Sequence, residues 1–343
     1  MKTRYKILFL AAAIPFCILA LILIVNQFSP LLKNQFVTIT PEKGITCSTV
    51  SEDGKWVAVD SDGKISILNA TNGNQQNTIS DIYSYPASGC IWMNLSFSPD
   101  GTLLAAASEK SVRVWNVESG VLVNKIMVAT KYPNLGDQAE ILQTIISPNN
   151  QFLVVVFTHF VEIYTINDSS LFTTIDSGSH DPADHLYRFA RFSPLGDFLL
   201  VATTQASDFI VYDFPYLQPQ NWTISASDKI YFAPDQKTVI YLEDNHIALH
   251  GDKKYEKIML PADSLGSISA VNFLNNSDEI IFANQKGSNQ WEIFHWNIET
   301  GEHATIVTTP SLPEGSNCEF SYNLSTIIWY PFSWSKKCGD LIL

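Results

Sequence analysis

Two histidines and two aspartates within six residues form the best metal-like group in the chain. The stretch 180–185 reads His-Asp-Pro-Ala-Asp-His and lies in a predicted loop. Imidazole nitrogens and carboxylate oxygens are ligands that zinc and manganese accept. A solvated polar loop has the same composition, and no second spaced motif accompanies this one. We therefore interpret this stretch as a solvated loop and predict no metal and no cofactor. If a metal does bind here, the candidate ligands are His180, Asp181, Asp184 and His185.

The motifs of common catalytic and phosphate-binding sites do not occur in the sequence. It contains no nucleophile elbow, no phosphate-binding loop and no His-Glu-x-x-His stretch. The stretch 60–63 reads Asp-Ser-Asp-Gly, like the start of a calcium loop, but the required downstream acidic residue is missing. A hairpin turn explains this stretch fully. We therefore predict no catalytic residue and no enzymatic activity.

The elements that must position any site repeat along the chain. Each copy has an alternating apolar strand, a polar turn, a second apolar strand and a third strand that ends in an aromatic residue. From Asp53 to Asn323 is 270 residues over six intervals, a mean period of 45. Pro, Asp, Asn and Gly suit the turn because they favour or tolerate its backbone angles. The turn is predicted at 51–54, 98–101, 147–150, 193–196, 233–236, 274–277 and 321–324.

With Ser98-Pro99-Asp100-Gly101 as its clearest turn, the chain resembles the WD-repeat family of β-propellers, in the style common in bacterial members. Trp115-Asn116, Tyr212-Asp213 and Trp296-Asn297 stand where the Trp-Asp dipeptide of the family falls. A period of about 40–45 residues with several strands per copy is typical of propellers. The family's Gly-His dipeptide is absent, and no copy keeps a full Trp-Asp. The resemblance implies an all-β fold over residues 34–343.

The two ends of the chain predict how such a ring closes. The seventh copy, 317–343, supplies three strands where a blade needs four, and one unassigned strand at 35–39 precedes the first copy. If the N-terminal strand completes the last blade, an exposed sheet edge is removed. We therefore predict a seven-bladed propeller. The alternative is a six-bladed ring with a frayed seventh copy.

An apolar block near the N-terminus predicts a membrane anchor. Residues 7–25 form 19 residues without a charged side chain, long enough to span a bilayer as a helix. The segment 1–6 carries three positive charges, so the positive-inside rule places it in the cytoplasm. Residues 26–33 are the linker, and the propeller is extracytoplasmic: periplasmic, extracellular or lumenal. A cleaved signal peptide is the alternative, although the block lacks an Ala-x-Ala site.

The charge balance bears on the partners of the chain. The whole chain has a formal net charge of −13, and beyond residue 6 the 18 basic and 34 acidic residues give −16. A phosphate-binding surface needs the opposite balance. We therefore predict that nucleic acid is not a partner.

Four cysteines lie outside the apolar block and allow three pairings. In the repeat register Cys318 and Cys338 fall within the seventh copy, and Cys47 and Cys90 fall at the first and second copies. We expect Cys318–Cys338 and Cys47–Cys90 disulfides in an oxidising compartment.

The resemblance also predicts where partners bind. In the resembling propellers, loops between blades lie on the top face, and long loops on a rigid scaffold are a usual location of recognition. The alternative is that aromatic residues in these loops only cap the blades. We predict a membrane-tethered scaffold that binds other proteins; the alternative is a propeller enzyme or ligand sensor with a metal or small-molecule site on the top face. The candidate binding residues are Tyr83, Tyr85, Tyr132, Phe332 and Trp334.

Overall fold

The computed structural model divides the chain into two compact units, Met1–Phe36 and Val37–Leu343. All elements described below belong to the second unit. The structure describes residues 38–39, 47–61, 64–79, 95–108, 111–128, 141–176, 187–203, 209–220, 222, 230–236, 238–243, 246–250, 257–258, 267–273, 278–286, 290–308, 316–320, 327–331 and 341–342.

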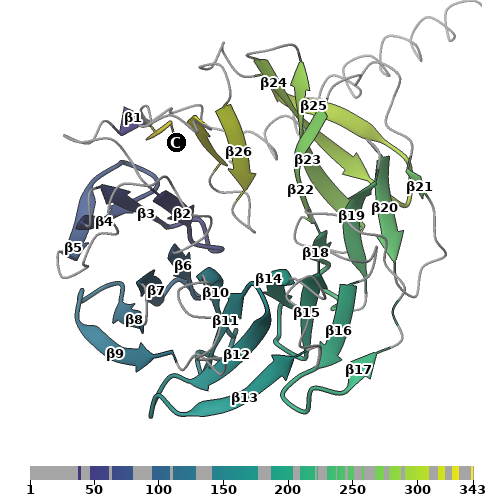
Figure 1. The fold of residues 1–343 in the computed structure, drawn as a ribbon. Helices are drawn as coiled ribbons and strands as arrows, with labels where there is room; N and C mark the ends of the chain where they lie inside the picture. Colours follow the sequence, from purple (N-terminus) through teal and green to yellow (C-terminus); the bar gives the residue numbers. More distant parts are fainter. Residues whose placement is uncertain are drawn as a thin grey trace, which may run out of the picture. The chain divides into compact units, whose positions relative to one another are not determined.

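Six four-stranded antiparallel sheets, which we call blades 1 to 6, are built from consecutive strands. Figure 1 shows them following one another around a common centre, with the first strand of each blade innermost. Blade 1 holds β2 (Cys47–Val50), β3 (Trp56–Ser61), β4 (Lys64–Asn69) and β5 (Gln75–Ile79); blade 2 holds β6 (Leu95–Phe97), β7 (Leu103–Ser108), β8 (Ser111–Asn116) and β9 (Leu122–Met127); blade 3 holds β10 (Ile141–Ile146), β11 (Phe152–Phe157), β12 (Phe160–Thr165) and β13 (Leu171–Asp176). Blade 4 holds β14 (Tyr187–Phe192), β15 (Phe198–Thr203), β16 (Phe209–Asp213) and β17 (Pro219–Gln220); blade 5 holds β18 (Ile230–Phe232), β19 (Val239–Glu243), β20 (His246–His250) and β21 (Lys257–Ile258); blade 6 holds β22 (Ser267–Phe273), β23 (Glu279–Lys286), β24 (Gln290–Asn297) and β25 (His303–Thr308).

A further four-stranded sheet combines the two ends of the second unit. Its strand order is β1-β28-β27-β26, with β1 (Thr38–Ile39), β26 (Ser316–Phe320), β27 (Ile327–Pro331) and β28 (Leu341–Ile342). Thr38 pairs with Ile342 and Ile39 with Leu341. The predicted pairing of the N-terminal strand with the last strand is therefore confirmed.

The predicted fold class, a seven-bladed propeller preceded by a transmembrane helix, needs correction on two points. None of the described residues forms a helix that could span a membrane, and the predicted anchor at 7–25, with 1–6 and 26–33 beside it, lies outside them. A long apolar run meets the length criterion for a span without requiring one. The predicted single-pass membrane localisation is accordingly not upheld.

The second correction concerns the number of complete blades. Six blades consist of four consecutive strands, whereas the terminal sheet combines β1 from the start of the unit with β26, β27 and β28 from its end. Only Trp329 and Ile342 are paired between β27 and β28. Seven equivalent repeats of consecutive strands therefore do not describe this unit.

The core lies between neighbouring blades, and blades 2 to 5 each bury both faces of their sheet. In β12, Phe160 and Tyr164 pack in a cluster with blade 2, while Val161 and Ile163 pack with Leu199 and its neighbours in blade 4. Side chains alternate between the two faces of a strand, so one strand serves both interfaces. This explains the nearly continuous apolar runs of the inner and middle strands.

Candidate functional site

The residues predicted to carry function fall almost entirely outside the described part of the chain. Cys47 lies in β2 and Cys318 in β26, but nothing is described of their side chains. Among the residues that the structure does describe, no group of three or more His, Cys, Asp or Glu could hold a metal ion. The metal ligands, the disulfides and the top-face residues therefore stay predictions. The residues outside the description are His180, Asp181, Asp184, His185, Tyr83, Tyr85, Tyr132, Phe332, Trp334, Cys90 and Cys338.

Five of the predicted turns are described, and they share one geometry. In each, the N–H of the fourth residue donates to the carbonyl of the first residue over 2.8 to 2.9 Å. The fourth residue has a positive φ, between 57° and 84°. A tight turn closed by one left-handed residue is a common hairpin connection. The five turns at 51–54, 98–101, 147–150, 193–196 and 233–236 are therefore confirmed.

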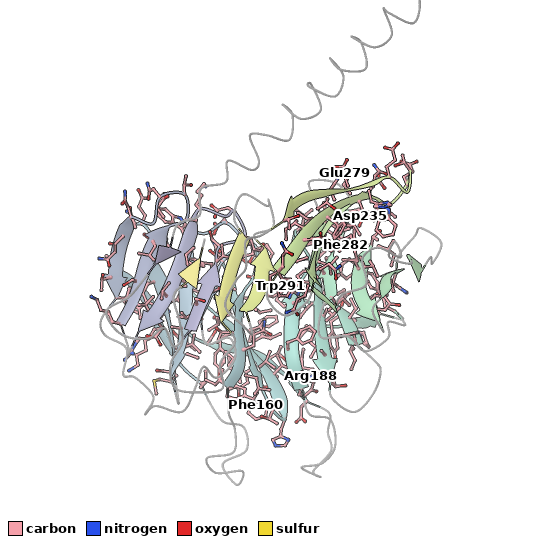
Figure 2. All side chains as sticks on the ribbon, turned by 90° about the horizontal axis from the view of Figure 1, so that it is seen from above. Phe160, Arg188, Asp235, Glu279, Phe282 and Trp291 are labelled. Atoms are coloured by element: carbon pink, nitrogen blue, oxygen red, sulfur yellow. The ribbon has the colours of Figure 1, made fainter. Side chains whose placement is uncertain are left out.

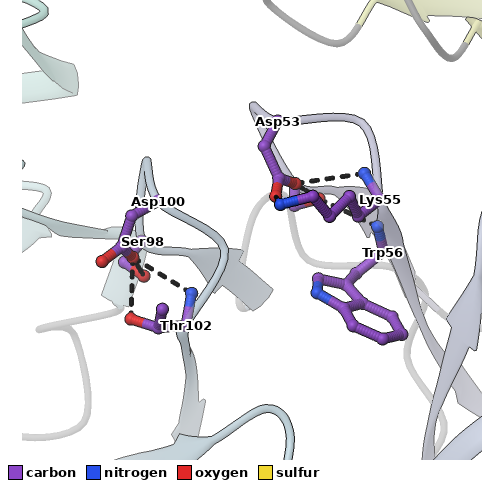
Figure 3. Close-up of polar contacts among 7 residues, drawn as sticks. Asp53, Lys55, Trp56, Ser98, Asp100 and Thr102 are labelled. Atoms are coloured by element: carbon purple, nitrogen blue, oxygen red, sulfur yellow. Dashed lines mark hydrogen bonds and ion pairs between the residues drawn. The ribbon is translucent and has the colours of Figure 1, made fainter.

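Side chains inside the turns hold this geometry (Figure 3). Ser98 Oγ donates to Asp100 Oδ1 over 2.6 Å, and Thr102 donates to the same oxygen from its N–H (3.0 Å) and its hydroxyl (2.8 Å). Asp53 is held likewise by Lys55, whose Nζ lies 2.9 Å from Oδ2. Partial burial alone would raise the pKa of both carboxyl groups, but the hydrogen bonds outweigh it and lower the pKa below the ordinary value of 3.8.

The left-handed residue of one turn also contacts the turn of the preceding blade. Asn150 Nδ2 donates to Asp100 Oδ2 over 2.8 Å. Gln236 Oε1 accepts from Ser193 Oγ (3.0 Å) and from the N–H of Leu195 (3.1 Å). These contacts join blade 3 to blade 2 and blade 5 to blade 4. In the sequence, these contacts are indicated by Asn or Gln in place of glycine at the fourth position of the turn.

Two asparagines on outer strands fasten neighbouring blades in a second way. Asn77 Nδ2 in β5 donates to the carbonyls of Val117 and Glu118, each over 2.7 Å. Asn124 Nδ2 in β9 donates in the same manner to the carbonyl of Ile166 over 2.5 Å. Each outer strand thus binds the turn that precedes the outer strand of the next blade. Blades 2 and 3 are therefore joined both at their inner turns and at their outer rim, and blades 1 and 2 are joined at their outer rim.

Exposed large apolar side chains gather on three consecutive blades. Among the residues whose side-chain exposure the structure describes, they occur in blades 2, 3 and 4, with exposed fractions from 42% to 78%. Single exposed apolar residues are normal on a protein surface, so the interest of these residues is that they belong to neighbouring blades. We call the set the apolar strip. It consists of Val121, Leu122, Val123, Met127, Leu171, Phe172, Leu195 and Tyr216.

A packed aromatic base supports the apolar strip across blades 3 and 4. The ring of Phe152 lies 5.2 Å from that of Phe172 and 5.1 Å from that of Phe214, both edge to face. Phe214 also packs against Phe192 at 5.0 Å, and its N–H donates to the carbonyl of Asp197 over 2.8 Å. The two turns of blade 4 that carry Leu195 and Tyr216 are therefore fixed to each other. Figure 1 shows that β9, β13 and β17 follow one another along the rim.

The inner strands carry a separate electrostatic contact. The guanidinium of Arg191 in β14 lies 4.2 Å from the ring centroid of Tyr231 in β18, a cation–π contact between blades 4 and 5. Glu52 in blade 1 is partly exposed to solvent, but desolvation by the surrounding protein raises the pKa of its carboxyl group. The positive charge of Arg191 partly offsets this rise. The cation–π contact therefore joins blades 4 and 5, and the charge of Arg191 also acts on Glu52 in blade 1.

Comparisons with known proteins agree with this architecture. Residues 80–116, which end with β8, match the family described as "WD domain, G-beta repeat". No curated protein matches the chain. Three similar solved structures are the Cps50 (Swd1) beta-propeller domain of Myceliophteria thermophila, U3-55K and the WD40 repeats of RRP9. Each has a TM-score of 0.61 and 13% to 14% sequence identity, with 89% to 90% of this chain and 97% to 98% of the other covered.

Identity this low establishes the fold and not the activity. The comparisons do not support the bacterial style of the repeats or the membrane anchor, so these parts of the predicted resemblance are dropped. Residues 80–116, in the region of blade 2, match a WD repeat, and the second unit has the fold of the WD40 propellers.

Proposed function

We propose that the chain is a non-catalytic protein-interaction scaffold and that the apolar strip is its contact surface. The observation that carries this proposal is that the large apolar side chains described as exposed all belong to blades 2, 3 and 4. Contact surfaces of proteins are enriched in aromatic and apolar anchors of this kind. The likeness to WD40 propellers supports a scaffold role.

The base of the strip supports the proposal because it is already ordered. The aromatic packing of Phe152 and the hydrogen bond from Phe214 to Asp197 fix the surface before a partner arrives. A preordered surface loses less conformational entropy on binding. Burial of an exposed side chain such as Tyr216, which is 78% exposed, contributes about 1.5–3 kcal/mol. A few such anchors suffice for a specific contact.

Affinity purification with matched variants tests the proposal. The strip variant carries Val123→Ser, Leu171→Ser and Tyr216→Ser. The control variant carries Gln75→Ser, Gln76→Ser and Thr78→Ser on β5, the corresponding outer strand of blade 1, where these three side chains are also exposed. Wild type and both variants are purified from cells of the source organism, and the bound proteins are quantified by mass spectrometry.

The expected result is a set of proteins that the wild type and the control variant retain and the strip variant loses. Circular dichroism and the unfolding midpoint establish that the strip variant is folded. If the folded strip variant retains every partner at wild-type yield, the apolar strip is not the contact surface and the proposal fails.

A further inference from the structure

We infer that the partner's contact segment is cationic and amphipathic, with apolar side chains interleaved with Lys or Arg. This inference rests on the proposed function, because it names the chemistry of the partner that the apolar strip accepts. It is carried by a second observation, namely the charge of the residues that border the strip.

An acidic side chain borders each part of the apolar strip. Glu118 lies in the turn that leads to Val121, and Asp168 lies in the turn that leads to Leu171. In blade 4 the two bordering acids belong to the turns that carry Leu195 and Tyr216; they are Asp197 and Asp213. The acids therefore recur with the apolar groups along the strip.

The basic residues of the same blades are placed differently. Of those that the structure describes in blades 2 to 4, Arg113 is buried and Arg191 covers the ring of Tyr231. Figure 2 shows Arg188 on the side of the sheets opposite to Asp235, which lies in one of the inner turns. Lys125 of β9 is the one exposed cation within the strip. Among the described residues that border the strip, four acidic side chains therefore occur with one exposed basic side chain, that of Lys125.

Among these acids, Asp168 keeps its charge under ordinary conditions. Asp168 is fully exposed and accepts hydrogen bonds from the Thr165 hydroxyl and from Ser170, through its N–H (3.0 Å) and its hydroxyl (2.7 Å). These bonds lower the pKa of Asp168 to about 2. Asp168 is therefore a carboxylate at any physiological pH.

This border discriminates between classes of partner. An entirely apolar segment would cover the carboxylates without pairing them, which is unfavourable. Nucleic acid or an anionic surface would be repelled by them. A segment with Lys or Arg between its apolar residues buries the strip and places opposite charges at its border, which also accelerates association.

Two synthetic peptides test this inference by fluorescence anisotropy. Both have the same Leu and Phe positions, and their polar positions are Lys in one and Glu in the other. The protein is the full chain as wild type, as the acid variant Asp168→Asn with Asp197→Asn, and as the apolar variant Leu171→Ser with Tyr216→Ser. A charge-matched control, Glu299→Gln with Glu302→Gln, removes two exposed acids of blade 6.

The expected result is binding of the Lys peptide to wild type and to the charge-matched control, with a roughly tenfold loss of affinity in the acid variant and in the apolar variant. The Glu peptide is expected not to bind. Affinity for the Lys peptide should fall as salt is added, because exposed charges are screened.

Two failures are distinguishable. If the apolar variant loses affinity but the acid variant does not, or if the Glu peptide binds as well as the Lys peptide, the charge inference is overturned and the proposed function stands. If the apolar variant binds the Lys peptide like wild type, the strip does not bind it and the inference fails; the affinity purification then decides on the proposed function alone. An equal loss in the charge-matched control would show attraction by net charge only and would also overturn the inference.

Discussion

The side-chain amide of Asn150 donates a hydrogen bond to the carboxylate of Asp100 over 2.8 Å and so joins the inner turn of blade 3 to that of blade 2. Gln236 makes the equivalent link from blade 5 to Ser193 in blade 4. Both residues occupy the left-handed position of their turn, with φ of 57° and 62°. One turn position therefore closes its own hairpin and orients the neighbouring blade.

A double-mutant cycle measures this link. Asn150→Gly removes the amide and tolerates the positive φ, and Asp100→Ala removes the carboxylate. We expect a coupling energy of about 0.5–1 kcal/mol from urea unfolding, because the pair is partly solvated. A cycle of Asn150→Gly with Glu302→Ala on blade 6 should be additive. A coupling of zero for Asn150 and Asp100 would mean that the hydrogen bond does not hold the two blades.

Substitutions at two glycines allow the cost of backbone strain to be measured separately from the cost of crowding between blades. Gly101 has φ +68°, and a Cβ there would lie 3.1 Å from Oδ1 of Asp53 in blade 1. Gly301 has φ +74°, and a Cβ there would meet nothing within 4 Å. We expect Gly301→Ala to cost about 1–2 kcal/mol from the left-handed backbone alone. Gly101→Ala should cost more in the same unfolding assay, and equal costs would show that the approach of Asp53 is unimportant.

The carboxylates of the turns predict acid sensitivity. The pKa of Asp53 and the pKa of Asp100 are lower in the folded chain than the ordinary value of 3.8. Below that value the unfolded chain binds more protons than the folded chain, so stability falls as pH falls from about 3.8 towards the folded pKa values. Above it the contribution is fully present. In urea unfolding between pH 6 and pH 3, Asp100→Asn should weaken the dependence on pH, and an unchanged slope would contradict this assignment.

Much of the fold follows from sequence, because local rules dictate its parts. Ser98-Pro99-Asp100-Gly101 predicts its turn, since Pro favours the entry angles and Gly the left-handed closure. A strand at 35–39 was predicted to complete the last copy, which lacked one, and the structure has β1 at Thr38–Ile39 paired with the last strand. In contrast, the apolar length of residues 7–25 predicted an anchor that the described structure does not bear out.

The candidate surface was not predicted, because its members look ordinary in sequence. Val121 to Val123 read as part of an alternating strand, and only their position on the outermost strand exposes them. The link of Asn124 to Ile166 spans 42 residues and depends on how two blades pack. The sequence analysis instead selected loop aromatics such as Tyr83 and Trp334, which lie outside the described residues.

The apolar strip should be dispensable for stability. Leu195 is 71% exposed and Tyr216 is 78% exposed, so Leu195→Ser and Tyr216→Ser should each change the free energy of unfolding by less than about 0.5 kcal/mol. Trp291, which is 2% exposed in blade 6, is the contrasting case, and Trp291→Ala should cost about 3–5 kcal/mol. A loss above about 2 kcal/mol for Tyr216→Ser would identify it as a structural residue.

Site-specific photo-crosslinking tests the central claim most directly. A photoreactive phenylalanine analogue replaces Tyr216 on the apolar strip or, as a control, Gln76 on the exposed outer strand of blade 1. On irradiation in cells of the source organism, we predict a discrete crosslinked adduct from position 216, diminished by Leu171→Ser and Leu195→Ser in the same chain, and none from position 76. Equal adducts from both positions, or none from position 216 in a folded protein, would contradict the assignment of the apolar strip as a protein-interaction surface.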